Sequence, residues 1–82
     1  MTEQAFKDSV RRYVDQKVRP GRFVRAVLAN DLFSAVQSAD PESLQLLPTF
    51  MDFVYNEIPS NVWGSYHVLA DHLSMQTEDV QP

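Results

Sequence analysis

The chain has 82 residues, no cysteine, a formal net charge of -4 at pH 7 and a pI near 4.8. This length suits one small domain, and the lack of cysteine excludes disulfides, a thiolate nucleophile and a Cys-ligated zinc. No run approaches the ~18 apolar residues of a membrane span and no signal-peptide core is present, so we expect a cytoplasmic protein.

The charges are strongly separated along the chain. Residues 1–25 hold all seven basic residues and three acidic ones, a net charge of +4, whereas residues 26–82 hold eight acidic residues and no Lys or Arg, a net charge of -8. Such asymmetry indicates either an anion-binding face or attraction between the two parts, within one molecule or between subunits of a homo-oligomer.

Residues 2–18 have the pattern of an amphipathic helix. Phe6, Val10, Tyr13, Val14 and Lys17 follow i, i+4, i+7, i+8 spacing, which gives a narrow apolar stripe. Tyr13 at such a position is typical of core packing with its hydroxyl at the rim, although it could instead contact a ligand.

Residues 21–39 form the most apolar stretch, and we expect one central helix there. Pro20 and Gly21 break the preceding helix and start this one. At 100° per residue Leu28 and Leu32 share one side, so both are predicted to be buried. Asp31 lies inside this apolar arc, where a carboxylate has to be paired, at an edge, or functional.

Arginines gather around the start of this predicted helix. A helix start with free amides and cationic side chains favours an anion or a carboxylate, so binding of an anion or a partner is assigned to Arg12, Arg19, Arg22, Arg25 and Tyr13. The alternative is that the arginines bridge to the acidic helices that follow. Gly21, the one glycine at this helix start, does not indicate a phosphate-binding loop, because the GxxxxGK spacing is absent.

A third helix is predicted over residues 41–57. Asp40 is a suitable N-cap and Pro41 a suitable first helical residue. Leu44, Leu47, Met51 and Val54 form its predicted buried stripe, and Pro48 predicts a kink.

An ordered loop and a short last helix, over residues 66–73, complete the expected domain. Pro59 ends the third helix, Gly64 allows a tight turn and Ser65 can cap the last helix. Trp63 either plugs this loop onto the core or faces a partner. The fold class is therefore an all-α small bundle of three main helices and a short fourth, with one domain over residues 1–74 and a flexible tail over residues 75–82.

No arrangement of side chains predicts catalysis. His67 and His72 are five residues apart, so they do not share a helix face as i, i+4 metal ligands would, and no nucleophile motif is present. We expect no enzyme activity, cofactor or metal. Binding of nucleic acid by the basic segment is a weaker alternative because the pI is low, and the acidic remainder could instead present a nucleic-acid-like surface to a basic partner.

Two segments, RPGxFxxAVLxNDLxxA (residues 19–35) and YNExPSxxWGS (residues 55–65), resemble those of short uncharacterised proteins carried by bacteriophages, prophages and other bacterial elements. The resemblance covers roughly residues 10–73. It implies a small accessory protein in the bacterial cell that modulates a host or defence component. It implies no residue roles.

Polar residues beside apolar neighbours predict a structural clasp between the second helix and the loop. Asp31 is expected to accept a hydrogen bond from the Trp63-Gly64-Ser65 loop or from a nearby arginine. The predicted members are Asn30, Asp31, Tyr55, Asn56 and Trp63. The expected function is a non-enzymatic interaction protein with a protein partner, and the alternative is a binder of an anionic small molecule, nucleotide or nucleic acid.

Overall fold

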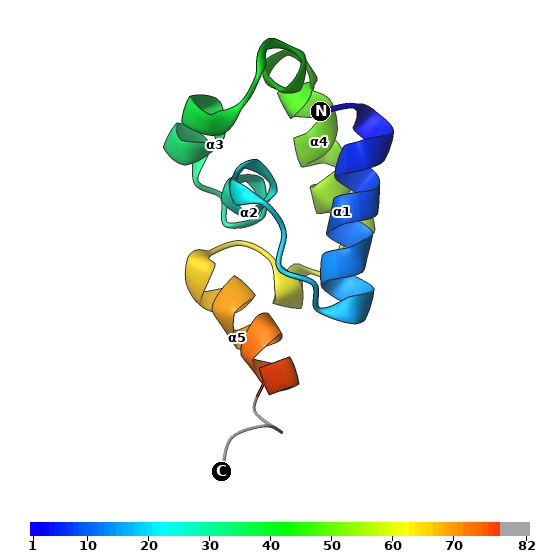
Figure 1. Ribbon diagram of the computed structural model, residues 1–82, viewed down its shortest axis with the longest axis vertical. Coiled ribbons are helices and arrows are strands. Elements are labelled where there is room, and N and C mark those ends of the chain that lie inside the picture. The colour runs from blue at the N-terminus through cyan, green and yellow to red at the C-terminus, as the bar shows by residue number, and fades with distance from the viewer. Residues whose placement is uncertain (78–82) are drawn as a thin grey trace.

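The computed structural model describes residues 1–77, and its regular elements there are all helical (Figure 1). In chain order they are α1 (Glu3–Gln16), α2 (Arg22–Leu28), α3 (Leu32–Ser38), α4 (Pro41–Glu57), the 3-10 turn η1 (Ser60–Val62) and α5 (Tyr66–Thr77). The predicted all-α class is confirmed. The prediction of three main helices and a short fourth is wrong in number, because the described residues form five α-helices. None of these helices has the length and apolar character needed to cross a bilayer.

Helix α1 agrees with the predicted helix to within two residues at its end. The Thr2 hydroxyl accepts a hydrogen bond from the Ala5 N–H at 3.1 Å and caps the first turn. Lys17 ends the helix in the left-handed region, with φ at 54°. The chain therefore turns at Lys17, just before the proline that was expected to cause the break.

The predicted helix over residues 21–39 is wrong, because it is interrupted at Asn30. Asn30 has φ at 60°, a left-handed conformation that asparagine tolerates better than most residues. Asp31 then caps α3 by accepting a hydrogen bond from the Ser34 N–H at 3.1 Å. The break turns the following residues out of line with α2, so Leu28 is fully buried while Leu32 is 65% exposed.

Helix α4 has the bounds that were predicted. Asp40 accepts a hydrogen bond from the Ser43 N–H at 2.7 Å, and Pro41 is the first helical residue. Pro48 lies inside α4, where it has no N–H to donate to the preceding turn. The kink at Pro48 stays a prediction.

The turn before α5 also follows its local sequence. Gly64 has φ at 124°, and the Ser65 hydroxyl accepts a hydrogen bond from the Val68 N–H at 3.2 Å, as its predicted capping role requires. Helix α5 continues to Thr77, four residues past its predicted end, so the predicted tail from residue 75 begins as helix. The rest of that tail, residues 78–82, lies outside the described residues.

The core forms where α1, α2 and α4 meet, with α5 and η1 packed below them (Figure 1). At its centre the Phe6 and Phe50 rings stack with their centroids 4.1 Å apart, and Phe23 and Phe53 approach Phe6 edge-on. Helix α2 contributes its buried residues Val24, Ala26, Val27 and Leu28. The central element is therefore this seven-residue helix and not a long rod.

Candidate protein-binding groove

Helix α4 has two apolar faces, and only one of them is covered. Phe50, Phe53 and Val54 are buried in the core. The second face carries Leu44, Leu47, Met51 and Tyr55, at i, i+3, i+7 and i+11 spacing. Leu44 and Met51 are exposed, so the predicted burial of these two residues is wrong.

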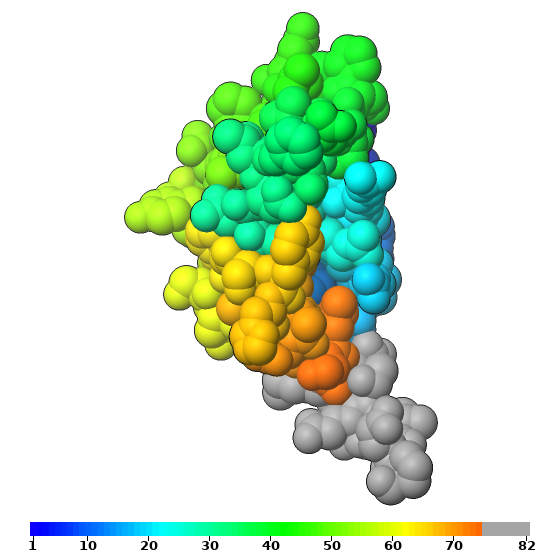
Figure 2. All heavy atoms as spheres, turned by 90° about the vertical axis from the view of Figure 1, so that its left-hand side faces the viewer, coloured from blue at the N-terminus to red at the C-terminus, as the bar shows by residue number. Residues whose placement is uncertain are grey.

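Helix α3 exposes most of its apolar side chains. It has seven residues and buries only Ala35. Leu32 is 65% exposed and Phe33 is 74% exposed, and Val36 is exposed as well. Figure 2 shows the face of the molecule on which α3 lies above α5. Several large apolar side chains exposed on one short helix are typical of an interaction surface.

A groove lies where α3 and the end of α2 face α4, and we call it the α3–α4 groove. Its narrow end has a volume of about 20 Å³ and its wide end about 350 Å³, and the two ends share Val27, Asn30 and Met51. The narrow end is completed by Ala26, Asp31, Leu32, Ala35 and Leu47, and the wide end by Asp52, Val54, Tyr55 and Trp63.

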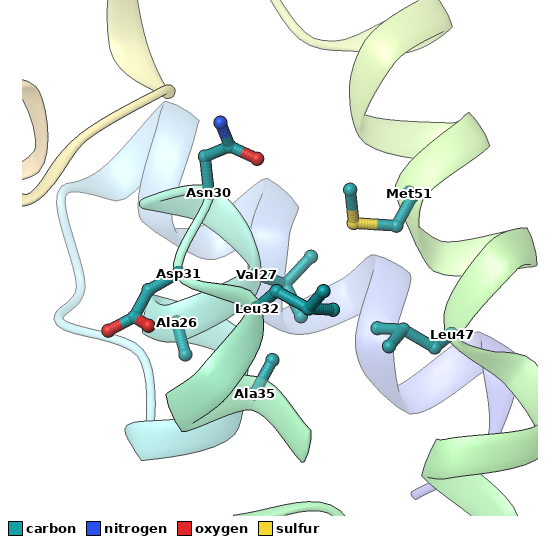
Figure 3. Close-up of a pocket in the computed structure, with 8 residues that line it drawn as sticks. All are labelled: Ala26, Val27, Asn30, Asp31, Leu32, Ala35, Leu47 and Met51. Atoms are coloured by element: carbon teal, nitrogen blue, oxygen red, sulfur yellow. The ribbon is translucent and has the colours of Figure 1, made fainter. Parts of the chain in front are cut away.

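The side chains at the narrow end come from opposite walls (Figure 3). Leu32 and Val27 point from α3 and α2 towards Leu47 and Met51 on α4, whereas the Asp31 carboxylate points away from this space. Methionine is unbranched and adapts its shape to a neighbouring surface. The groove therefore presents an apolar floor with polar groups at its edges.

The wide end is built around Trp63. Its indole N–H donates to the Ile58 carbonyl at 3.2 Å, and its ring packs edge-on against Tyr55 with centroids 6.5 Å apart. Trp63 is half-buried and packs against the core, as one of the two predicted roles requires. Tyr55, which is 75% exposed, stands beside it.

A clasp between α3 and α5 exists, but its donor differs from the one expected. The Asp31 carboxylate accepts a hydrogen bond from the Tyr66 hydroxyl at 2.7 Å, and not from the Trp63-Gly64-Ser65 loop or an arginine. This bond, followed by that from Ser34, lowers the pKa of Asp31, and the same carboxylate raises the pKa of Tyr66. The loop itself is held by the Gly64 N–H, which donates to the Leu28 carbonyl at 2.7 Å.

The other predicted clasp residues have different places. Asn30 forms the joint between α2 and α3 and lines the groove with Tyr55 and Trp63. The Asn56 side chain donates to the Asp52 carbonyl one turn earlier, on the exposed side of α4. Sequence reasoning missed Tyr66, although a hydroxyl-bearing aromatic directly after the capping Ser65 was a usable signal.

The arginines make no ion pair within residues 1–77. Each carboxylate of that part is more than 4.0 Å from every arginine, so the predicted bridges to the acidic helices are not found there. Arg19 and Arg25 line one hollow of about 310 Å³ with Tyr66, Leu69, Ala70 and Leu73. Arg12 and Arg22 are exposed and do not line that hollow.

Tyr13 is not available to a ligand, because it is fully buried. Its hydroxyl donates to the Val62 carbonyl at 2.7 Å, which is the packing alternative considered for this residue. Burial raises the pKa of Tyr13 to about 12. The assignment of Tyr13 to an anion-binding surface is therefore wrong.

The histidines do not form a metal centre in the described part of the chain. His67 lies 3.5 Å from Asp71 on the surface of α5, and His72 donates from Nε2 to the Tyr13 carbonyl at 2.9 Å. Among residues 1–77 no three His, Asp or Glu side chains gather closely enough to hold a metal ion.

Comparisons with protein-family models, curated proteins and solved structures find no match to this chain. The α3–α4 groove is therefore assigned from its own geometry.

Proposed function

We propose that this protein acts without catalysis by binding a protein partner in the α3–α4 groove. The observation that supports this most directly is the exposure of Leu32, Met51 and Tyr55 along a groove with an apolar floor. A small domain that leaves such side chains uncovered loses the free energy that their burial would supply, about 1.5 to 3 kcal/mol for each fully buried large side chain. A partner that covers these side chains recovers this free energy on binding.

The sequence resemblance supports a biological setting for this binding. Short proteins of bacteriophages and prophages with similar segments imply an accessory protein that modulates a bacterial host or defence component. Phe23 and Leu28, which belong to those segments, pack in the core, whereas Asn30, Asp31, Tyr55 and Trp63 line the groove. The similar segments thus include both the scaffold and the walls of the proposed binding surface.

A pull-down from a bacterial lysate tests this function with two matched variants. Leu32→Asp places a charge in the groove, and Val18→Asp places one on an exposed apolar residue between α1 and α2, which is 44% exposed and outside the groove. We expect wild type and Val18→Asp to retain the same partner and Leu32→Asp to lose at least nine-tenths of it. Circular dichroism checks that all three proteins are folded. Equal retention by wild type and Leu32→Asp would contradict the proposal.

The second candidate function is binding of an anionic small molecule in the hollow beside α5. It is favoured by Arg19 and Arg25, which lie over an apolar floor and have no carboxylate partner within residues 1–77. A panel of nucleotides and phosphates at low and high salt tests it by thermal shift. A ligand at a hundredfold excess over its Kd stabilises the folded state by about 2.7 kcal/mol. If no ligand of the panel raised the melting temperature, this candidate function would be removed. Arg22→Gln serves as the control variant outside the hollow.

A further inference from the structure

We propose that the segment which enters the α3–α4 groove is an amphipathic helix of another protein, with an apolar stripe flanked by Lys and Arg. This inference rests on the proposed function and identifies the chemistry of the partner.

The charged residues that line the groove are both acidic. From Asn30 to Tyr66 the chain contains no Lys, Arg or His, and its five ionisable acids are Asp31, Asp40, Glu42, Asp52 and Glu57. Asp31 and Asp52 line the groove, one at each end. The Asp31 carboxylate points away from the floor of the groove and accepts a hydrogen bond from Tyr66, so its charge lies at the edge. Complementary charge at the edge of an interface selects partners and raises association rates.

Two cations, Lys7 and Arg11, line a second hollow of about 340 Å³ together with Asp52, and both have other contacts. Lys7 pairs with Glu3 at 3.0 Å, and Arg11 lies over the Phe53 ring, 5.4 Å from its centroid. Neither comes within 4.0 Å of Asp52 in the described residues. The Asp52 carboxylate is therefore free to attract a cation that approaches from the groove.

The length of the groove fits one face of a helix. Leu47 and Tyr55 are eight residues apart on α4, which corresponds to roughly 12 Å at 1.5 Å per residue. Apolar side chains at i, i+3 or i+4, and i+7 of a partner helix span about 10 Å. The wide end beside Trp63 is suited to the largest of them, and Met51 can adapt to the others.

The same charges disfavour the other occupants. A symmetric pair of copies would bring the Asp31 and Asp52 carboxylates of both grooves together, with no Lys or Arg among the groove-lining residues to offset them. The basic segment of a second copy offers little apolar surface, because Phe6, Val10 and Tyr13 on α1 are buried in its own core. Nucleic acid and anionic lipid surfaces would be repelled by Asp31, Asp52 and Glu57.

The test uses three synthetic 18-residue peptides without tryptophan, so that the emission of Trp63, the single tryptophan, reports binding. The first has a leucine stripe flanked by Lys, the second has the same stripe flanked by Glu, and the third is a scramble of the first without the stripe. We expect the Lys-flanked peptide to bind at least tenfold more tightly than either of the others and to weaken between 50 and 500 mM salt.

Matched variants assign the binding to the groove. Leu32→Asp should lower the affinity for the Lys-flanked peptide at least tenfold, and Asp52→Asn should lower it two- to fivefold. Asp15→Asn, on the exposed side of α1, should change this affinity less than 1.5-fold. Circular dichroism again checks folding. The expected pattern would support the inference.

Three results would overturn it. If the Lys- and Glu-flanked peptides bound equally well and Leu32→Asp abolished the binding of both, the groove would still be the binding site. The proposed preference for a partner helix with basic flanks would be refuted. Equal binding of the scramble would show attraction of charge alone. Light scattering that shows a dimer of wild type but not of Leu32→Asp would place a second copy in the groove. The proposed function is judged separately, because it fails only if the lysate pull-down does not distinguish Leu32→Asp from wild type.

Discussion

At the scale of single residues, Tyr13 connects three segments that are far apart in the sequence. Its hydroxyl donates to the Val62 carbonyl, its own carbonyl accepts a hydrogen bond from His72, and its ring centroid lies 4.7 Å from that of His72. One side chain of α1 thereby holds both η1 and α5. The stripe spacing of α1 indicated that Tyr13 packs inwards, but the partners come from residues 49 and 59 positions away.

Replacing Tyr13 with Phe tests this connection. We expect Tyr13→Phe to lower the free energy of unfolding by about 1 kcal/mol at pH 7, because the ring stays and one hydrogen bond is lost. The pKa of Tyr13 is raised from its usual 10.0 to about 12, so the folded state holds this proton more tightly. The stability that comes from the protonated Tyr13 hydroxyl is fully present below pH 10 and is lost as the pH rises towards 12.

Urea unfolding at pH 7 and across pH 9 to 12 measures both effects. The difference in stability between wild type and Tyr13→Phe should narrow above pH 10. A constant difference across that range would contradict the assignment of the raised pKa to Tyr13.

At the scale of elements, the joint at Asn30 determines where α3 points. The sequence contains the local signals for a break, since asparagine tolerates left-handed backbone and aspartate is a strong N-cap. The apolar periodicity on both sides masks them, because the same spacing continues from α2 into α3. The result is a short helix that places Leu32 beside the groove and buries only Ala35 in the core.

Substitutions at Asn30 separate the backbone requirement from the side chain. Asn30→Gly should change the free energy of unfolding by less than about 0.5 kcal/mol, because glycine adopts positive φ without strain. Asn30→Val should lower it by about 1 to 3 kcal/mol, because a β-branched residue is strained there. Thermal and urea unfolding give the values. Equal stability of the two variants would show that this joint does not need its left-handed conformation.

The start of α4 is held by a contact with the N-terminus of the chain, and the strength of this contact should depend on pH. The Met1 amine donates to the Asp40 carboxylate at 2.9 Å and to the Ser43 hydroxyl at 3.0 Å. The amine lowers the pKa of Asp40 from its usual 3.8, and Asp40 raises the pKa of the amine from its usual 8.0. Stability from Asp40 is present above about pH 4 and is lost as the pH falls, whereas stability from the amine is present below pH 8 and is lost as it rises.

Asp40→Asn removes the shorter of the two ion pairs of the Met1 amine and leaves the one with Glu42 at 3.4 Å, while asparagine is also a good N-cap. In protein with a free Met1 amine, we expect wild type to have a higher Tm than Asp40→Asn by a constant amount between pH 4 and 8. The difference should shrink at pH 2.5 and at pH 10. Melting curves across this range measure it, and a difference that persists at both extremes would refute the role of the charges.

At the scale of the whole molecule, the two charge blocks are not joined by arginine bridges in residues 1–77. The contacts that hold the fold together are instead apolar packing, helix caps, a few hydrogen bonds between elements and the ion pair of the Met1 amine with Asp40. The separated charge is therefore available for partners. Asp31 and Asp52 of the acidic block line the α3–α4 groove, and Arg19 and Arg25 line the hollow beside α5.

Reversing a charge at Arg22 tests whether the basic segment stabilises the fold. Arg22→Glu should change the free energy of unfolding by less than about 0.5 kcal/mol at both 50 and 500 mM salt, because Arg22 is exposed and has no carboxylate within 4.0 Å in the described residues. Urea unfolding measures it. A loss above 1 kcal/mol that disappears at high salt would show that the two charge blocks attract each other within the molecule.

The sequence by itself determined the helical class, the bounds of α4, and the caps and turns at Asp40, Gly64 and Ser65. These features follow from interactions between residues a few positions apart, which the chain order already specifies. Tertiary structure decided which apolar residues are covered. Leu28 and Leu32 have the same character and were predicted on the same helix face, yet Leu28 is fully buried and Leu32 is 65% exposed. Burial depends on which distant elements meet, and that is why the groove was found only in the folded molecule.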